Sequence, residues 1–133
     1  MALTQQQLEK LRQVRMFVLD MDGTIYLGES LFPFTKGFLR RVEETGRDFC
    51  FFTNNSSKNR EAYLEKLARM GISLPPEKML ISNGVILQWL GQHHPGARCY
   101  VVGTRALRED FRKAGVAPDA EDGDVVILGF DTT

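Results

Sequence analysis

The sequence has few cysteines, no excess of charge of either sign and no long apolar run. Its 133 residues include two cysteines, and lysine plus arginine equals aspartate plus glutamate at 17 each. A formal net charge of zero argues against nucleic acid or an anionic membrane surface as the main partner, because both require a basic face. Apolar runs such as 125–128 are far too short to span a bilayer, so no membrane partner is expected.

The cysteines and the N-terminal residues favour a cytoplasmic location. Residues 1–14 are polar with a helical pattern, unlike the apolar centre of a signal peptide. Cys50 and Cys99 each lie in an apolar, strand-like run, so we expect buried, reduced thiols, with a disulfide between them as the less favoured alternative. An apolar fraction of 43% and a charged fraction of 26% are typical of a globular protein, and the length suits one ordinary domain.

Apolar runs alternate with helical stripes along the chain, which predicts βαβ units and a parallel sheet. The expected strands occupy 15–19, 47–52, 79–81, 98–102 and 125–130. The expected helices occupy 4–14, 35–45, a segment ending near 70, a segment ending at 93–94 and a segment between 104 and 115, with a small hairpin or flap in 25–33. The first strand reads as buried on both faces, and Trp89 reads as a core residue.

Two carboxylates follow the first expected strand directly, at Asp20 and Asp22, and Gly23 comes next. Ligands of open α/β sheets bind at the carboxyl ends of strands, which puts this pair at the expected site. One carboxylate can bind a metal and attack as a nucleophile while the other carries a proton. Gly23 allows the backbone to turn and to approach a ligand closely. The alternative is an ordinary turn, since Asp and Gly are common turn residues.

A second polar cluster follows the second expected strand. Thr53, Asn54 and Asn55 bring hydroxyl, amide and backbone N–H groups to a strand end before a helix, which is typical of an anion-binding site. The alternative is simple capping of the next helix by Ser56 or Ser57. A Gly-x-Gly-x-x-Gly pattern after the first strand and a Gly-Lys-Ser/Thr loop are both absent from the sequence, which disfavours a dinucleotide or P-loop site.

These two clusters together resemble the haloacid dehalogenase-like phosphatase superfamily, and more narrowly its NagD/4-nitrophenylphosphatase type. The resemblance rests on residues 22–28, 51–57, 100–103 and 128–131 and extends over nearly the whole chain after the first helix. It implies an α/β fold with a Rossmann-like, three-layer parallel sheet, followed by the start of an α/β cap. Residues 1–95 would belong to the core and 96–133 to the cap. The strand pattern alone also suits a single doubly wound sheet, but we favour the two-part arrangement.

The resemblance implies a Mg²⁺-dependent phosphatase of small phosphorylated metabolites. Asp20 would be the nucleophile that forms an aspartyl-phosphate, and its carboxylate would bind Mg²⁺. Asp22 would carry the proton, and its backbone carbonyl would be a second Mg²⁺ ligand. The phosphoryl group would be held by Thr53 and the Asn54 amide, with Gly23 and Asn55 beside them. These roles agree with phosphoryl transfer, which depends on positioning and on charge neutralisation.

One departure from the family pattern limits what the chain can do. The family also uses a lysine near the phosphoryl group and an acidic Gly-Asp-x-x-x-x-Asp motif, both downstream of the cap, and no such acidic motif occurs here. The chain therefore resembles the N-terminal portion of a family member and is expected to hydrolyse phosphate esters poorly. Exposed apolar surface would favour a homo-oligomer. The competing functions are a receiver-like phospho-aspartate module and a non-catalytic binding or assembly protein; an Asp-x-Asp glycosyltransferase is disfavoured.

Overall fold

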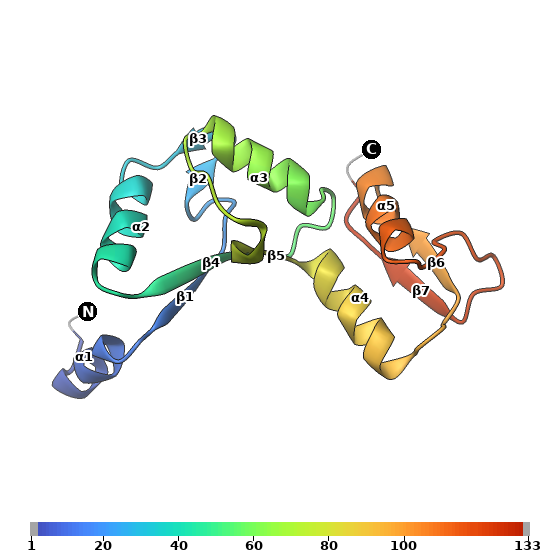
Figure 1. The fold of residues 1–133 in the computed structure, drawn as a ribbon, viewed down its shortest axis with the longest axis horizontal. Helices are drawn as coiled ribbons and strands as arrows, with labels where there is room; N and C mark the ends of the chain where they lie inside the picture. Colours follow the sequence, from blue (N-terminus) through green and yellow to red (C-terminus); the bar gives the residue numbers. More distant parts are fainter. Residues whose placement is uncertain (1–2, 132–133) are drawn as a thin grey trace.

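The computed structural model describes residues 3–131, and its strands form two separate parallel sheets beside a small hairpin (Figure 1). The first sheet has the order β1-β4-β5, and the second pairs β6 with β7. The strand bounds are β1 Met16–Leu19, β2 Tyr26–Leu27, β3 Ser30–Leu31, β4 Asp48–Thr53, β5 Met79–Ile81, β6 Cys99–Val102 and β7 Val125–Leu128. The single doubly wound sheet is therefore wrong for the described residues, and the assignment of 1–95 to a core and 96–133 to a cap stays a prediction.

The helices follow the predicted order. Their bounds are α1 Gln5–Arg12, α2 Thr35–Glu44, α3 Arg60–Arg69, the short 3-10 helix η1 Pro76–Lys78, α4 Ser82–His93 and α5 Arg105–Lys113. Helix α1 begins with a capping box, in which the Thr4 hydroxyl accepts from the Gln7 N–H at 3.2 Å and the Gln7 side chain accepts from the Thr4 N–H at 2.9 Å. None of the helices in residues 3–131 is long and apolar enough to cross a bilayer.

Helices α2 and α3 pack on one face of the first sheet and leave the other face open. Their buried side chains form one core with the sheet and the β2–β3 hairpin, including Leu39, Val42, Phe49, Phe51, Tyr63, Leu67, Met79 and Ile81. On the opposite face Val18 is 64% exposed, and Met16 is exposed beside it. The prediction that the first strand is buried on both faces is therefore wrong. β1 pairs only with β4, so it is an edge strand in the described residues.

A second core lies around β6, where α4 and α5 meet. It contains Leu90, Cys99, Val101, Leu107 and Phe111. The prediction that Trp89 belongs to a core is wrong, because its side chain is 44% exposed and stacks on His93 with ring centroids 4.8 Å apart. The buried stripe of α4 runs through Leu90, so Trp89 lies on the outward side. The two cysteines, Cys50 and Cys99, are free and buried as predicted.

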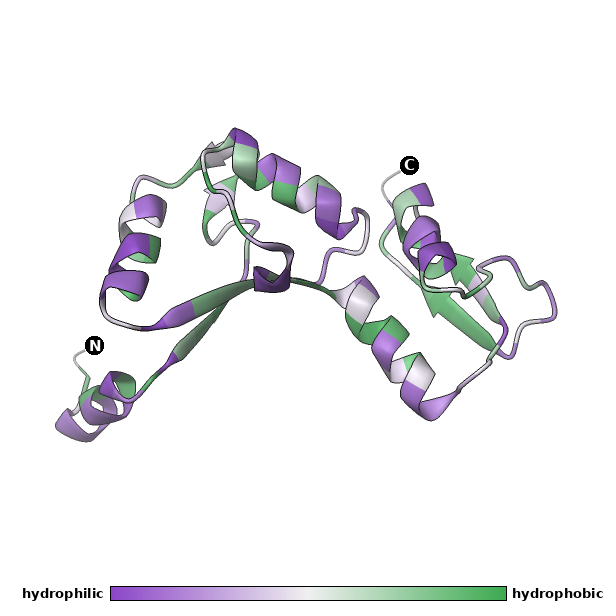
Figure 2. Ribbon diagram, in the orientation of Figure 1, coloured by the Kyte–Doolittle hydropathy of each residue, from purple (hydrophilic) through white to green (hydrophobic). Residues whose placement is uncertain are grey.

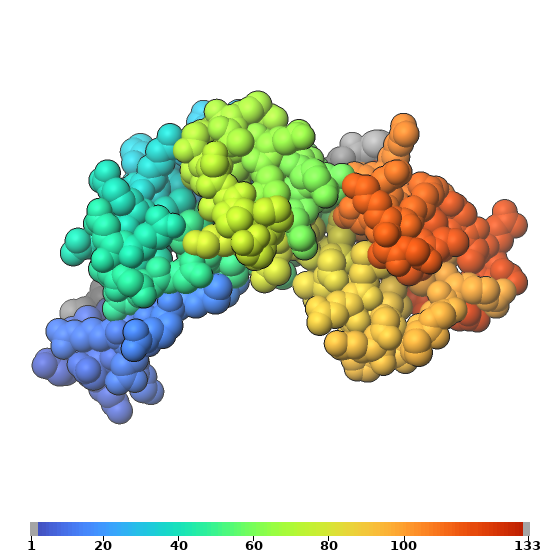
Figure 3. Space-filling model, in the orientation of Figure 1, coloured from blue at the N-terminus to red at the C-terminus, as the bar shows by residue number. Residues whose placement is uncertain are grey.

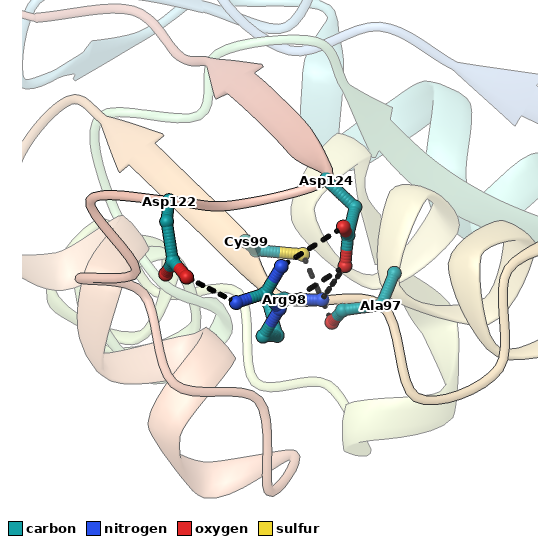
Figure 4. A network of polar contacts seen from close by, with 5 residues as sticks. All are labelled: Ala97, Arg98, Cys99, Asp122 and Asp124. Atoms are coloured by element: carbon teal, nitrogen blue, oxygen red, sulfur yellow. Dashed lines mark hydrogen bonds and ion pairs between the residues drawn. The ribbon is translucent and has the colours of Figure 1, made fainter.

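The Arg98 side chain binds the acidic loop between α5 and β7 (Figure 4). The Arg98 guanidinium contacts Asp122, and its Nη2 lies 3.2 Å from Asp124 Oδ1. This hydrogen bonding holds the pKa of the Asp124 carboxyl below its ordinary value. Asp119, in the same loop, pairs with Arg108 and Arg112 of α5. These aspartates tie the loop to Arg98 at the start of β6 and to α5.

The part of the molecule built on the first sheet and the part built on β6 and β7, here called the first and second units, meet at the loop between β4 and α3 (Figures 1 and 3). The Thr104 hydroxyl donates to the Ser57 carbonyl at 3.0 Å, and the Phe130 N–H donates to the Ser56 hydroxyl at 2.6 Å. Nearby, the Asn83 amide donates to Asp110 at 2.9 Å, which joins α4 to α5. The unit built on β6 and β7 is therefore attached directly to the loop that follows Thr53.

We expect the chain to self-associate through its exposed apolar strand faces. Leu128 is 81% exposed, and Val126 and Val18 are also exposed on strands that Figure 2 shows as predominantly apolar. Sedimentation velocity should show a concentration-dependent increase in mass. The paired substitution Val126→Lys and Leu128→Lys should reduce it, whereas Leu27→Lys in the hairpin serves as the control. A wild-type chain that stays monomeric at high concentration would contradict this expectation.

The stability of the contact between α4 and α5 should depend on pH through Asp110. Burial raises the pKa of Asp110 above its ordinary value of 3.8, and the Asn83 hydrogen bond only partly opposes the increase. The folded state therefore holds a proton that the unfolded state has released, so this contribution to stability is lost as pH rises through the raised pKa. Asp110→Asn keeps an acceptor for Asn83 and should remove this pH-dependent loss of stability. The loss should amount to about 1 kcal/mol or less, because solvent screens this half-exposed group.

Urea unfolding across pH 3 to 8 measures this effect as the difference between wild type and Asp110→Asn. Asp124→Asn is the matched control of opposite sign, because the lowered pKa of Asp124 gives stability that is lost as pH falls. Equal pH profiles for wild type and Asp110→Asn would show that Asp110 titrates normally in the folded chain.

Candidate active site

A tight loop at the end of β1 presents the two predicted catalytic carboxylates. The Gly23 N–H donates to the Tyr26 carbonyl at 2.8 Å, and the N–H groups of Thr24 and Ile25 both donate to the Met21 carbonyl at 3.0 Å. Gly23 has a φ of 79°, a conformation that residues with a Cβ rarely adopt. The chain therefore reverses immediately after Asp22 and continues into the hairpin.

A hydroxyl orients the first carboxylate. Thr24 donates to Asp20 Oδ2 at 3.2 Å, across the same tight loop. Asp20 is exposed at the end of β1, so this contact restricts its side chain without removing it from solvent. The Asp-x-Asp-Gly-Thr sequence thus supplies its own orienting group at the fifth position.

The second polar cluster forms an irregular loop rather than a helix start. Thr53 is buried as the last residue of β4, and its hydroxyl accepts from the Asn55 N–H at 3.2 Å. The Asn55 side chain in turn accepts from the Ser57 N–H at 3.0 Å. Helix α3 begins only at Arg60, and Asn59 caps it by accepting from Ala62. The alternative of a cap by Ser56 or Ser57 is therefore wrong, because the loop is longer than the sequence pattern indicated.

The two loops line one cavity of about 300 Å³. Its walls are Asp20, Asp22, Thr53, Asn54, Asn55 and Phe130. Because β1 and β4 are adjacent and parallel, with Leu19 paired to Phe51, their carboxyl ends place the acids and the Thr53 loop on the same edge of the sheet. All of the predicted site residues except Gly23 line this cavity. The backbone N–H of Gly23 is used inside its own loop, so the loop geometry supports a structural part for this residue.

Sequence reasoning missed several residues around this cavity. Lys66, on α3, is the most unusual: its side chain is only 7% exposed, and its Nζ lies 3.9 Å from Asp22 Oδ1. Burial raises the pKa of the Tyr26 phenol far above its ordinary range, and the Asp22 carboxylate adds to the increase. Burial also raises the pKa of Tyr63, which faces the same acids. The available signal was that Lys66 falls between Tyr63 and Leu67 on the apolar stripe of α3, where a lysine is rare.

The donor atoms at the cavity suit a hard divalent cation. Carboxylate, hydroxyl and amide oxygens line it, which is the donor type that Mg²⁺ prefers. Among residues 3–131, however, no group of three or more His, Cys, Asp or Glu side chains is placed to hold a metal ion. Asp20 and Asp22 therefore fit Mg²⁺ as part of a ligand set.

Comparison with known proteins places this chain in a family. The model of the haloacid dehalogenase-like hydrolase family matches residues 17–117. The chain belongs to the haloacid dehalogenase-like hydrolases. Within them it falls in the NagD/4-nitrophenylphosphatase subfamily, as its resemblance at Asp20–Thr24 and at the Thr53 loop predicted.

The most informative relatives are phosphatases or solved structures of this subfamily. An acid sugar phosphatase of Staphylococcus aureus is 31% identical over 91% of this chain. The crystal structure of a 4-nitrophenylphosphatase from Thermotoga maritima is 37% identical over 92% of the chain, with a TM-score of 0.87. NagD from E. coli K-12 is 25% identical over 88%, with a TM-score of 0.76. The chain spans about half the length of these relatives, between 46% and 47% of each.

A glycine substitution tests the loop that presents the acids. Gly23→Ala places a Cβ on a backbone with φ of 79° although nothing lies within 4 Å of it, so the cost is conformational, about 1 kcal/mol. Gly37→Ala is the matched control. Gly37 lies in α2 with equally open space around it, so its replacement by alanine should stabilise the chain by about 1 kcal/mol. Chemical denaturation measures both. Opposite signs are expected, and a neutral Gly23→Ala would show that the loop tolerates another conformation.

Proposed function

We propose that this chain carries the nucleophile half of a Mg²⁺-dependent phosphatase that acts on small phosphorylated metabolites through an aspartyl-phosphate. The observation that supports the proposal best is the shared cavity, in which two carboxylates from one strand end face the Thr53–Asn55 loop of the adjacent strand end. The named activities of the relatives, acid sugar phosphatase and 4-nitrophenylphosphatase, agree with it. The oxygen donors and the small volume of the cavity suit the phosphoryl group of a small ester.

The proposed reaction has two displacements at phosphorus. Asp20 attacks the phosphoryl group, the bond to the ester oxygen breaks, and Asp22 gives its proton to the departing alcohol. A water then attacks the aspartyl-phosphate and loses its proton to Asp22, which releases inorganic phosphate and restores both carboxyl groups. The Thr24 hydroxyl holds Asp20 in place during the attack, a role that its 3.2 Å contact with Asp20 Oδ2 supports.

The loop after β4 would hold the transferring phosphoryl group. The Thr53 side chain is buried and fixed by its bond to Asn55, so its hydroxyl needs little reorganisation when substrate binds. The Asn54 backbone amide would donate beside it. Mg²⁺, held by the Asp20 carboxylate and the Asp22 backbone carbonyl, would neutralise charge between the carboxylate and the phosphate.

A second candidate is a module that accepts a phosphoryl group without turnover, or one that only binds. One observation favours it: the described cavity walls contain two acidic side chains but no basic side chain. A stable aspartyl-phosphate at Asp20 would indicate the first form of this alternative. The absence of any reaction with phosphodonors would indicate the second.

We expect the 133 residues alone to hydrolyse 4-nitrophenyl phosphate at least about 100-fold more slowly than the Thermotoga maritima relative assayed in parallel. The loss of a single group that stabilises the transition state commonly costs that much, and the 133 residues contain no Gly-Asp-x-x-x-x-Asp motif. The measurement is 4-nitrophenol release with and without Mg²⁺, on material whose intact mass confirms the chain length.

Asp20→Asn is the decisive variant for this assay. Any Mg²⁺-dependent turnover should disappear in this variant. Acid-stable phosphate bound to the protein after a quench should be found on the wild type and be absent from Asp20→Asn. Turnover that persists in Asp20→Asn would contradict the proposed nucleophile. Wild-type turnover equal to that of the relative would contradict the incomplete site.

A further inference from the structure

Lys66 is a buried cation outside the cavity walls, and its position has an electrostatic reason. An ammonium group removed from water is costly unless anions or aromatic faces compensate it. Lys66 Nζ lies 3.9 Å from Asp22 Oδ1 and 3.8 Å from Glu29 Oε1. The chain therefore keeps a positive charge inside the core at the point where the Asp22 loop and the β2–β3 hairpin meet α3.

An aromatic ring forms the floor of this cation site. Lys66 Nζ lies 4.1 Å from the centroid of the Tyr26 ring, well within the range of a cation–π interaction. Tyr26 is fully buried at the start of β2, next to the loop that carries Asp22. The ammonium group therefore has the Tyr26 ring as an aromatic neighbour and the Asp22 and Glu29 carboxylates as anionic neighbours.

Glu29 gives the ammonium group a second anion from the turn of the hairpin. Glu29 also lies 3.7 Å from Arg69, the next basic residue on the same side of α3. Arg69 is exposed and pairs with Glu29, whereas Lys66 is buried and contacts both acids. Lys66 and Arg69 thus share Glu29 but differ in burial and in contact with Asp22.

We propose that Lys66 is a positioning residue for Asp22, and that Glu29 competes with Asp22 for it. At 3.9 Å the ammonium group attracts the Asp22 carboxylate without the short hydrogen bond that would occupy its oxygens. Asp22 therefore stays at the cavity with an oxygen available for proton transfer. The catalytic meaning of this contact rests on the proposed phosphatase function, whereas the contact itself does not.

Nuclear magnetic resonance of the 133-residue chain tests the contact without any turnover. Lys66→Met should shift the side-chain carboxyl carbon signals of both Asp22 and Glu29. Arg69→Met, the matched control on the same helix, should shift the Glu29 signal alone. In the reverse direction, Asp22→Asn should shift the Lys66 ammonium nitrogen signal, and Glu29→Gln should shift it as well.

The signal of Asp22 decides this experiment. An Asp22 carboxyl signal that is unchanged in Lys66→Met, in a chain that remains folded by its amide spectrum, would overturn the proposal. If Lys66→Met fails to fold, the reciprocal shift of the Lys66 ammonium in Asp22→Asn gives the same information, because Asp22 is exposed and its replacement leaves the core intact. An unchanged ammonium signal there would also overturn it.

Leaving-group dependence separates positioning from general damage in any preparation that hydrolyses 4-nitrophenyl phosphate. An alkyl phosphate needs a proton on its leaving oxygen, whereas 4-nitrophenolate leaves without one. Lys66→Met should therefore lower kcat/KM for the alkyl ester about tenfold more than for the nitrophenyl ester, and Lys66→Arg should restore part of that difference. Equal losses for both esters would make Lys66 purely structural. A wild type that neither hydrolyses an ester nor forms an aspartyl-phosphate contradicts the proposed function only, and the Asp22 signal still decides the contact.

Discussion

The parallel pairing of β1 with β4 is the constraint on which the candidate site depends. Leu19 pairs with Phe51, so the two strands end at the same edge, and the acids that follow one strand meet the Thr53 loop that follows the other. The chain separates these clusters by the hairpin and α2, and only the sheet brings them together. The site inherits its precision from backbone hydrogen bonds and from the core beneath them, which α2 and α3 cover.

Strand and helix positions were predictable because the local signals are strong. Thr4 with Gln7 marked the start of α1, and short apolar runs followed by polar clusters marked β1 and β4. The candidate site residues were predicted from the same pattern, since Asp20, Asp22 and Thr53 stand at strand ends, and their roles stay a prediction. Ligands of open α/β sheets bind at the carboxyl ends of the strands, so these positions predict one shared site at that edge of the sheet.

The failures came from features that depend on contacts distant in sequence. An apolar run such as β1 shows that a strand is apolar, but the number of covered faces depends on which elements pack against it, and Val18 remains exposed. The burial of Trp89 could not be predicted for the same reason, because an apolar stripe on α4 does not show which side of the helix meets the second core. Lys66 was overlooked since its burial is explained only by Tyr26, Asp22 and Glu29, which a helical pattern cannot reveal.

The hydrogen bond from Phe130 to Ser56 has a mechanical consequence. Phe130 follows β7 in the second unit and lines the cavity, while Ser56 belongs to the loop that would hold phosphate. One wall of the cavity is thus carried by a unit that is joined covalently to the first sheet only through α4. A rotation of that unit about α4 would widen the entrance and pull on the phosphate loop in the same movement. The width of this cavity and the shape of the loop that follows β4 would therefore change together.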